Sequence, residues 1–170
     1  MKFIMINGCS CAGKSTIVKR IISEKERYYQ LSSGSQKWLF SKYDRTVHFE
    51  DVRKVVLSLA ETLCAMEYTI VCDSALYREN RETLLEIPKK YGYDIVEINL
   101  EAAYPVLEKR FEARLEEASK NPHSKISNTS KERFKELYDI YQSEKNKEAL
   151  TFQTDDMTLD ETFSEIDKVL

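Results

Sequence analysis

Residues 8–15 read GCSCAGKS and fit the pattern G-x-x-x-x-G-K-[ST], which constrains the fold more than any other segment of the chain. Glycines in such a loop let the backbone turn tightly, so that its N–H groups and the positive end of the next helix surround a phosphate. The apolar residues 3–6 precede the loop, as in a buried parallel strand, and an apolar stripe at helical spacing follows it. Strand, glycine loop and helix in this order predict a loop that binds nucleotide phosphates.

The loop pattern also assigns roles to its last residues. We expect Lys14 to reach the β- and γ-phosphate oxygens and the Ser15 hydroxyl to hold Mg²⁺. The residues predicted to bind the nucleotide are Gly8, Cys9, Ser10, Cys11, Ala12, Gly13, Lys14, Ser15 and Thr16.

The rest of the chain alternates between short apolar runs and stretches of helical period. The 170 residues are enough for one domain with a single core, residues 1–170. Four runs after the first read as strands: 28–31, 69–72, 94–100 and 151–154. Helices are expected at 51–66, at 80–91 (with a kink or early end at Pro88), at 106–118, and after the capping-box patterns that begin at Thr129 and Thr158. The alternation predicts an α/β, three-layer fold with helices on both faces of a parallel sheet.

Composition narrows the setting. No apolar run approaches the roughly 18 residues of a membrane span, so no membrane partner is expected. The net charge of −3 does not favour general nucleic-acid binding. Four cysteines are too few for a disulfide scaffold and suggest a reducing, cytoplasmic location, with a redox role for Cys9 and Cys11 left open. Residues 109–135 carry eight Lys or Arg against four Glu, which suggests phosphate chemistry or a solvated helix face.

Asp73 directly follows the third predicted strand. Ligands of parallel α/β sheets bind at the carboxyl ends of the strands. A carboxylate there can bind Mg²⁺ through water or orient an acceptor beside the γ-phosphate, whereas a turn or N-cap aspartate is the structural alternative. A GTPase would have glycine at position 76, which is Leu, and residues 146–149 lack the final aspartate of N-K-x-D.

Several segments, taken in order, resemble the small P-loop kinases of the polynucleotide kinase-like, AAA_33-type group. They are the loop, residues 73–76 (DSAL) with the charged 78–81, residues 91–94 (YGYD), residues 107–114 (LEKRFEAR), and Thr154-Asp155 before the last helix. The resemblance implies strand order 2-3-1-4-5 and a small helical lid over approximately residues 110–133. It also implies that Arg110 and Arg114 are lid arginines, and their spacing independently puts them on one helix face. The catalytic residues predicted are Lys14, Asp73, Arg110 and Arg114.

The acceptor side departs from that family. Kinases of the group that act on a hydroxyl usually have an aspartate just after the second strand, but residues 31–35 read LSSGS. The segment is partly similar to the S-T-G-D stretch of nucleoside monophosphate kinases, although the arginine of that motif falls on Trp38. The acceptor-binding residues predicted are Ser33, Lys37, Arg45 and Arg78, with Lys42 as a further cation. If the acceptor is a hydroxyl, Asp73 is the candidate base, with Asp44, Glu50 and Asp51 in reserve.

Three functions therefore stay open. The first is a kinase that uses ATP and Mg²⁺ to phosphorylate a small molecule or a nucleotide. The second is a polynucleotide 5′-hydroxyl kinase, in which Trp38, Phe40 and Tyr43 stack on a base or instead pack in the protein. The third is a nucleotide sensor without catalysis, suggested by the missing acid. A monomer or a small homo-oligomer fits each.

Overall fold

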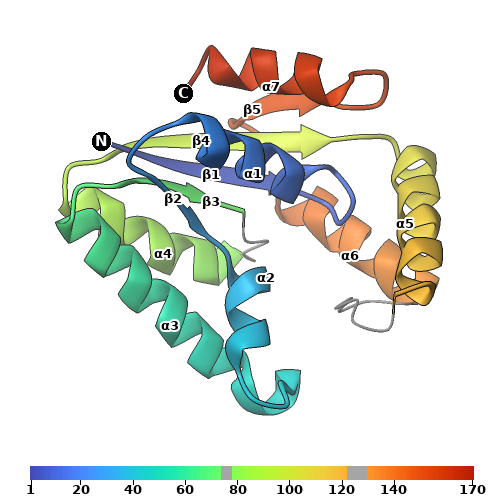
Figure 1. Ribbon diagram of the computed structural model, residues 1–170, viewed down its shortest axis with the longest axis horizontal. Coiled ribbons are helices and arrows are strands. Elements are labelled where there is room, and N and C mark those ends of the chain that lie inside the picture. The colour runs from blue at the N-terminus through green and yellow to red at the C-terminus, as the bar shows by residue number, and fades with distance from the viewer. Residues whose placement is uncertain (74–77, 122–129) are drawn as a thin grey trace.

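In the computed structural model, which describes residues 1–73, 78–121 and 130–170, a parallel sheet forms the centre of the molecule (Figure 1). The strand order is β2-β3-β1-β4-β5, as predicted. The strands are β1 (Lys2–Gly8), β2 (Tyr28–Leu31), β3 (Thr69–Cys72), β4 (Asp94–Glu101) and β5 (Leu150–Gln153). The helices are α1 (Lys14–Glu24), α2 (Ser33–Gln36), the 3-10 helix η1 (Lys37–Leu39), α3 (Arg45–Ala65), α4 (Arg78–Lys90), α5 (Tyr104–Ser119), α6 (Lys131–Glu144) and α7 (Leu159–Asp167).

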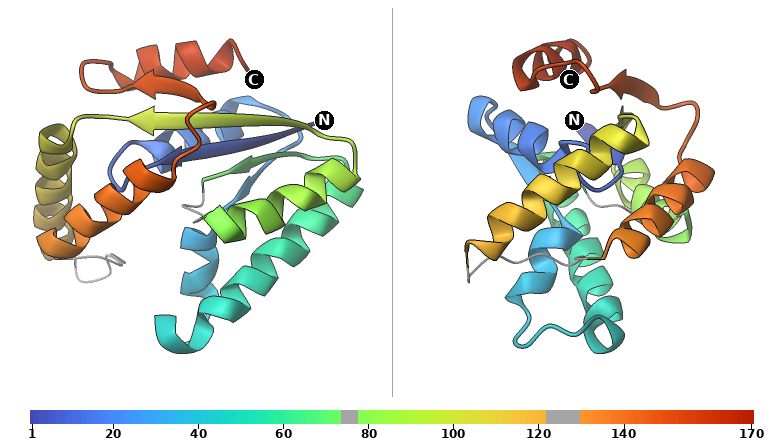
Figure 2. Two further views of the ribbon diagram at one scale, coloured as in Figure 1. Left: turned by 180° about the vertical axis from the view of Figure 1, so that it is seen from behind. Right: turned by 90° about the vertical axis from the view of Figure 1, so that its right-hand side faces the viewer.

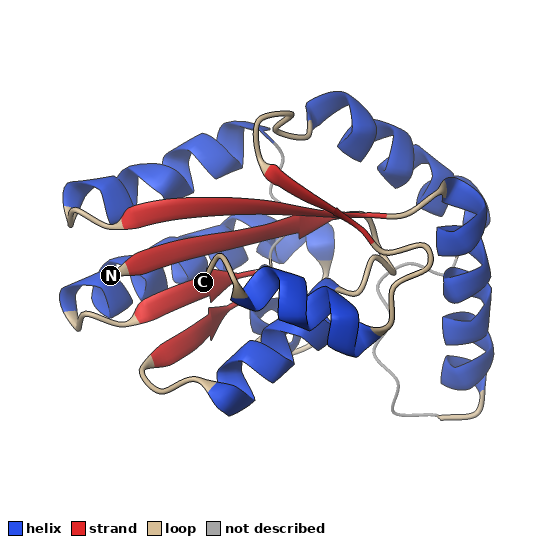
Figure 3. Ribbon diagram, turned by 90° about the horizontal axis from the view of Figure 1, so that it is seen from above, coloured by secondary structure: helices blue, strands red, loops and turns tan. Residues whose placement is uncertain are grey.

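The central strand β1 is buried on both faces, because helices cover each side of the sheet (Figure 3). Ile4 and Ile6 pack in a core with α1 and α7, whereas Phe3 and Met5 pack in a second core with α3 and α4. Strands covered on both sides need apolar residues throughout, which explains the continuous run in the sequence. β1 runs in register with β4 from Lys2↔Asp94 to Gly8↔Leu100.

Helices α5 and α6 stand beyond the carboxyl ends of the strands (Figures 1 and 2). Aromatic side chains join them: the rings of Phe111 and Phe134 stack with centroids 4.4 Å apart, and Tyr104 lies edge-on to Tyr138 at 5.1 Å. Such pairs stabilise beyond their buried area. These contacts hold α5, which carries both Arg110 and Arg114, against α6.

Several boundaries differ from the sequence expectations. α3 begins at Arg45 because the Asp44 side chain caps it, accepting a hydrogen bond from the Thr46 N–H at 2.7 Å. α4 continues past Pro88 to Lys90, and the Pro88 carbonyl accepts from the N–H groups of Tyr91 and Tyr93 in the turn that follows. α2 and η1 were not expected. The capping box at Thr158 is confirmed, with Glu161 closing it.

Two expected features lie at or beyond the limits of the described residues. Thr129 is outside them, and the helix expected after it begins at Lys131 with Ser130 as its N-cap. Residues 122–129 of the predicted lid are also outside, so the lid stays a prediction. None of the described helices combines the length and the apolarity needed to span a membrane.

Candidate nucleotide and acceptor site

The loop between β1 and α1 has the backbone that its glycines predict. Gly8 adopts φ +152°, and a Cβ there would lie 2.5 Å from the carbonyl oxygen of Leu100 on β4. Gly13 adopts φ +92° as the N-cap of α1, and its carbonyl accepts from the N–H groups of Thr16 and Ile17. Only glycine fits the close approach at residue 8, and residue 13 needs the left-handed region that glycine enters freely. The sequence thus turns the chain directly into the N-terminus of α1.

The two loop cysteines are free thiols with different surroundings. Cys9 is buried, and this burial raises the pKa of its thiol to about 11. Cys11 is half-buried and adopts φ +67°, a strained backbone for a residue with a Cβ. A raised pKa keeps Cys9 protonated and weakly nucleophilic at neutral pH. The geometry therefore favours a packing role for Cys9, while the half-buried Ser10 and the buried Ala12 complete the loop.

Lys14 folds back over the loop that precedes it. Its Nζ donates to the carbonyl oxygens of Gly8 at 2.8 Å and Cys9 at 2.7 Å. An ammonium group has three donors, so these carbonyls orient it and leave a donor for a phosphate oxygen. Burial lowers the pKa of Lys14. A charge held in this way is available for the phosphates that the loop would cradle.

Ser15 and Asp73 meet although 58 positions separate them in the chain. The Ser15 hydroxyl donates to Oδ2 of Asp73 at 3.1 Å, and the Gln30 amide donates to the same oxygen at 3.2 Å. Asp73 is only 7% exposed, and its Oδ1 has no hydrogen-bond partner among the described residues. A hydroxyl and a carboxylate with a buried, unpartnered oxygen fit a Mg²⁺ ion held partly through water. The sequence analysis did not predict a role for Gln30. The available signal was its position near the end of β2, which pairs with β3, the strand that Asp73 follows.

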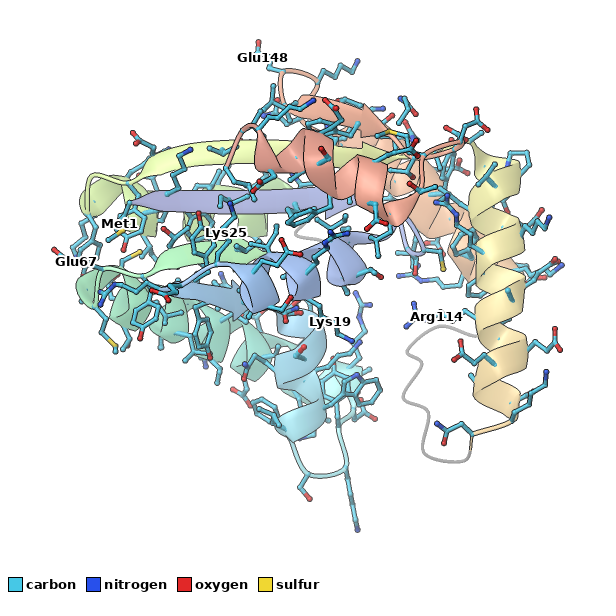
Figure 4. All side chains as sticks on the ribbon, turned by 45° about the horizontal axis from the view of Figure 1, so that its top comes forward. Met1, Lys19, Lys25, Glu67, Arg114 and Glu148 are labelled. Atoms are coloured by element: carbon cyan, nitrogen blue, oxygen red, sulfur yellow. The ribbon has the colours of Figure 1, made fainter. Side chains whose placement is uncertain are left out.

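The paired arginines of α5 have different surroundings. Arg110 donates to Thr154, with Nη2 2.6 Å from its carbonyl oxygen and Nη1 3.2 Å from its hydroxyl. Arg114, one turn further, is exposed and extends from α5 toward the side of the molecule that carries α2 (Figure 4). Burial is the main cause that lowers the pKa values of Lys14 and Lys37, and the positive charge of Arg114 adds a smaller contribution to each. The structure thus brings Arg114 near the loop and ties Arg110 to the end of β5.

The predicted acceptor residues lie on the segment after β2, apart from Arg78. Ser33 opens α2 and is half-buried, Lys37 opens η1, and Arg45 opens α3. Arg78 opens α4, and its side chain lies outside the described residues. The acids held in reserve are exposed and have local partners. Asp44 caps α3, Glu50 pairs with Arg53 at 3.1 Å, and Asp51 pairs with Lys54 at 3.8 Å.

The sheet order, the glycine loop and the Ser15–Asp73 pair define a P-loop protein with the three-layer fold of the P-loop kinases. The family model described as "AAA domain", AAA_33, matches residues 3–137. The chain belongs to this family. Among curated protein sequences, none shows significant similarity to it.

Solved structures share the fold at low sequence identity. A kinase candidate from Chloroflexus aurantiacus j-10-fl superposes with a TM-score of 0.71 at 15% identity, covering 99% of this chain and 98% of that one. An APS kinase from Mycobacterium tuberculosis, solved with AMPPNP and APS, gives 0.60 at 16% identity, with 99% and 96% covered. A chain of the Pnkp1/Rnl/Hen1 RNA repair complex gives 0.67 at 15%, with 84% of this chain but 44% of that one covered.

Proposed function

We propose that this protein is an ATP- and Mg²⁺-dependent phosphotransferase that moves the γ-phosphoryl group to a small-molecule or nucleotide acceptor. The observation that carries the proposal is the 3.1 Å hydrogen bond between Ser15 and Asp73, directly beside a loop whose carbonyls orient Lys14. This arrangement meets the needs of phosphoryl transfer, in which catalysis consists of positioning and of stabilising charge.

Each group then has a role in the transfer. The loop N–H groups bind the β-phosphate and Lys14 bridges the β- and γ-phosphates, while Arg114 stabilises negative charge on the group in flight. Ser15 and Asp73 would hold Mg²⁺, which would supply positive charge at the phosphate oxygens. The bond from the γ-phosphorus to the ADP oxygen breaks as a bond forms to the acceptor oxygen. If that oxygen is a hydroxyl, its proton passes to Asp73 or to solvent.

Arg110 takes a different part from Arg114 in this proposal. Its two hydrogen bonds to Thr154 fix α5 against the end of β5, so that Arg110 orients the helix that presents Arg114. We keep the predicted lid over approximately residues 110–133 as part of the proposal, because closure over the phosphates would exclude water from the transfer.

The names of the structural neighbours support a kinase and leave the acceptor open. One is an APS kinase bound to AMPPNP and APS, and another belongs to an RNA repair complex. A polynucleotide 5′-hydroxyl kinase is the alternative, in which Trp38, Phe40 and Tyr43 would stack on a base. The rings of Trp38 and Tyr43 pack edge-on against each other, with centroids 5.8 Å apart, which favours a packing role for both. The net charge of −3 does not favour a polyanionic strand.

A location in a reducing compartment such as the cytoplasm is also proposed. Cys9, Cys11, Cys64 and Cys72 are free thiols, as expected where glutathione keeps cysteines reduced. The proposal holds for a monomer or a small homo-oligomer.

The test is incubation with γ-labelled ATP and Mg²⁺ over a panel of acceptors, with Lys14→Ala as the blank. The panel contains nucleoside monophosphates, nucleosides, sugars, sugar phosphates and 5′-hydroxyl oligonucleotides. Label on an acceptor supports the proposal and names the class. ATP binding without transfer to any acceptor, together with an Arg114→Ala variant that binds ATP equally well, would instead support a nucleotide sensor.

A further inference from the structure

Three positive side chains lie on the proposed acceptor side of the site. Lys37 of η1 and Arg45 of α3 follow β2, and Arg114 of α5 approaches from the other side (Figure 4). Among the residues that the structure describes, no carboxylate forms an ion pair with any of these three side chains. The acids nearest in sequence are engaged, because Asp44 caps α3 and Glu50 pairs with Arg53.

The surroundings of Lys37 disfavour its charged form. Its side chain is half-buried, and burial, together with the charges of Arg45 and Arg114, lowers its pKa. Elsewhere the chain supplies an acid to a lysine in a similar place: Lys145 lies 2.6 Å from Glu101, with both side chains largely buried. A half-buried cation that faces other cations is destabilising unless an anion binds there.

Aromatic rings orient the two cations of the β2–α3 segment without neutralising them. The Lys37 ammonium lies 4.8 Å from the centroid of the Trp38 ring, and the Arg45 guanidinium lies 5.5 Å from that of Phe49. A cation–π contact stabilises the charge and restricts its direction, but it supplies no negative charge and leaves N–H donors unpaired. The N–H donors of Lys37 and Arg45 therefore stay available for an anion.

One of the three cations also faces the phosphate loop. Arg114 acts electrostatically on Lys14 in the phosphate loop and on Lys37 on the acceptor side. The end of β2, where a base for a neutral hydroxyl acceptor would stand, carries Ser32 and Ser33 and no carboxylate. The position of Arg114 and the lack of a carboxylate after β2 both favour a negatively charged acceptor.

We infer that the acceptor carries a phosphomonoester group, which Lys37 and Arg45 bind opposite the phosphate loop. This inference rests on the proposed phosphotransferase function and names its acceptor class. The phosphomonoester is either the accepting group itself or a second group on a molecule whose hydroxyl accepts. A charge-assisted hydrogen bond to a phosphate is strong enough for each cation to change acceptor affinity about tenfold or more.

The experiment compares matched pairs of acceptors: AMP with adenosine, and glucose 6-phosphate with glucose, each with γ-labelled ATP and Mg²⁺. The variants are Lys37→Met and Arg45→Met, with Lys54→Met as the control because Lys54 is exposed on the same helix as Arg45 and pairs with Asp51. We expect label only on phosphorylated members of a pair. We expect KM for that acceptor to rise at least tenfold in both test variants, with KM for ATP unchanged and the control like wild type.

The product identifies which role the phosphomonoester has. Label in a diphosphate linkage shows that the phosphate accepts, and label on a new ester shows that a hydroxyl accepts. Equal or faster labelling of the neutral members, or unchanged acceptor KM in Lys37→Met and Arg45→Met, overturns the inference while the kinase proposal stands. Label confined to 5′-hydroxyl oligonucleotides overturns it in favour of a polynucleotide kinase.

Calorimetric binding of AMP to protein saturated with AMPPNP and Mg²⁺ separates this inference from the proposed function. Weakened AMP binding in both variants, in a protein that transfers no label, keeps the phosphomonoester site and overturns the kinase proposal. Absence of AMP and glucose 6-phosphate binding in wild type overturns the inference whatever the transfer assay gives. Equal melting temperatures of the three variants and wild type check that each is folded.

Discussion

The proposed donor half of the site, residues 8–16 with Asp73, and the proposed acceptor half, residues 32–50, are built in different ways. In the donor half, main-chain carbonyls of the loop orient Lys14, and the buried carboxylate of Asp73 accepts a hydrogen bond from Ser15. In the acceptor half α2, η1 and the first turns of α3 present side chains that are mostly partly or largely exposed, including Leu39 at 77% and Val47 at 66%. Under the proposed function, phosphate binding would be fixed by the backbone, whereas acceptor choice would depend on individual side chains.

The largest expected effect is on the donor half. Lys14→Ala should lower kcat/KM for labelled-phosphate transfer about 10³-fold, because it removes the charge that bridges the β- and γ-phosphates. Steady-state transfer assays with the preferred acceptor measure this. Lys89→Ala is the control, since Lys89 is an exposed lysine at the end of α4 that pairs with Glu86. A loss below tenfold would mean that the loop does not act on the transferred phosphate.

Asp73→Asn should be slightly milder, with a loss of a few hundredfold in kcat at fixed Mg²⁺. The amide keeps the size of the carboxylate and can still accept from Ser15, but it lacks the charge that holds the ion. Raising the Mg²⁺ concentration should recover part of the activity, and an activity titration against Mg²⁺ reads this out. Asp94→Asn, an exposed acid at the start of β4, should behave like wild type. An unshifted Mg²⁺ dependence would contradict the assignment of Asp73.

The two halves also differ in how far the sequence predicted them. The glycine loop specifies its own conformation locally, so β1, α1 and the strand order followed from pattern and resemblance. The contact between Gln30 and Asp73 depends on strand pairing, and the bond of Arg110 to Thr154 depends on tertiary packing. The helical spacing of Arg110 and Arg114 placed them on one face but could not show that their guanidinium groups diverge. α2 and η1 were missed because segments of three or four residues carry too little periodicity to recognise.

That divergence yields a prediction of intermediate size, in which two neighbouring arginines give opposite results. Arg114→Ala should lower kcat by about 10²-fold or more and leave the free energy of unfolding unchanged, because Arg114 is exposed and, in the proposed function, acts on the transferred phosphate. Arg110→Ala should lower the free energy of unfolding by about 1–3 kcal/mol, because two hydrogen bonds to Thr154 are lost. Urea unfolding and single-turnover transfer measure the two quantities separately. Equal kinetic losses with equal stabilities would show that both arginines contact the transferred group.

The smallest effect concerns α3, whose two ends belong to different environments. Arg45 at its start is exposed, whereas Cys64 near its end is buried, and burial raises the pKa of the Cys64 thiol from 9.0 to about 11. Between pH 9 and 11 the unfolded chain releases this proton while the folded chain keeps it, so the free energy of unfolding falls as pH rises. Well below pH 9 the thiol is protonated in both states, and its ionisation adds no pH dependence. Cys64→Ala should reduce that fall by about 1–2 kcal/mol, measured by urea unfolding at pH 8 and pH 11.

Two further variants turn this pH dependence into a test of the comparison between the halves. Thr62→Ala, on the same helix, removes no titrating group and should shift stability equally at both pH values. Arg45→Met should likewise leave the fall in stability between pH 8 and pH 11 unchanged. Arg45 is exposed at the start of α3, so its replacement should not disturb the buried end of the helix that contains Cys64. A slope altered by Arg45→Met would show that the acceptor half is coupled to the core. Its side chains would then be constrained by folding as strongly as the phosphate loop, and acceptor preference could not be changed there without loss of stability.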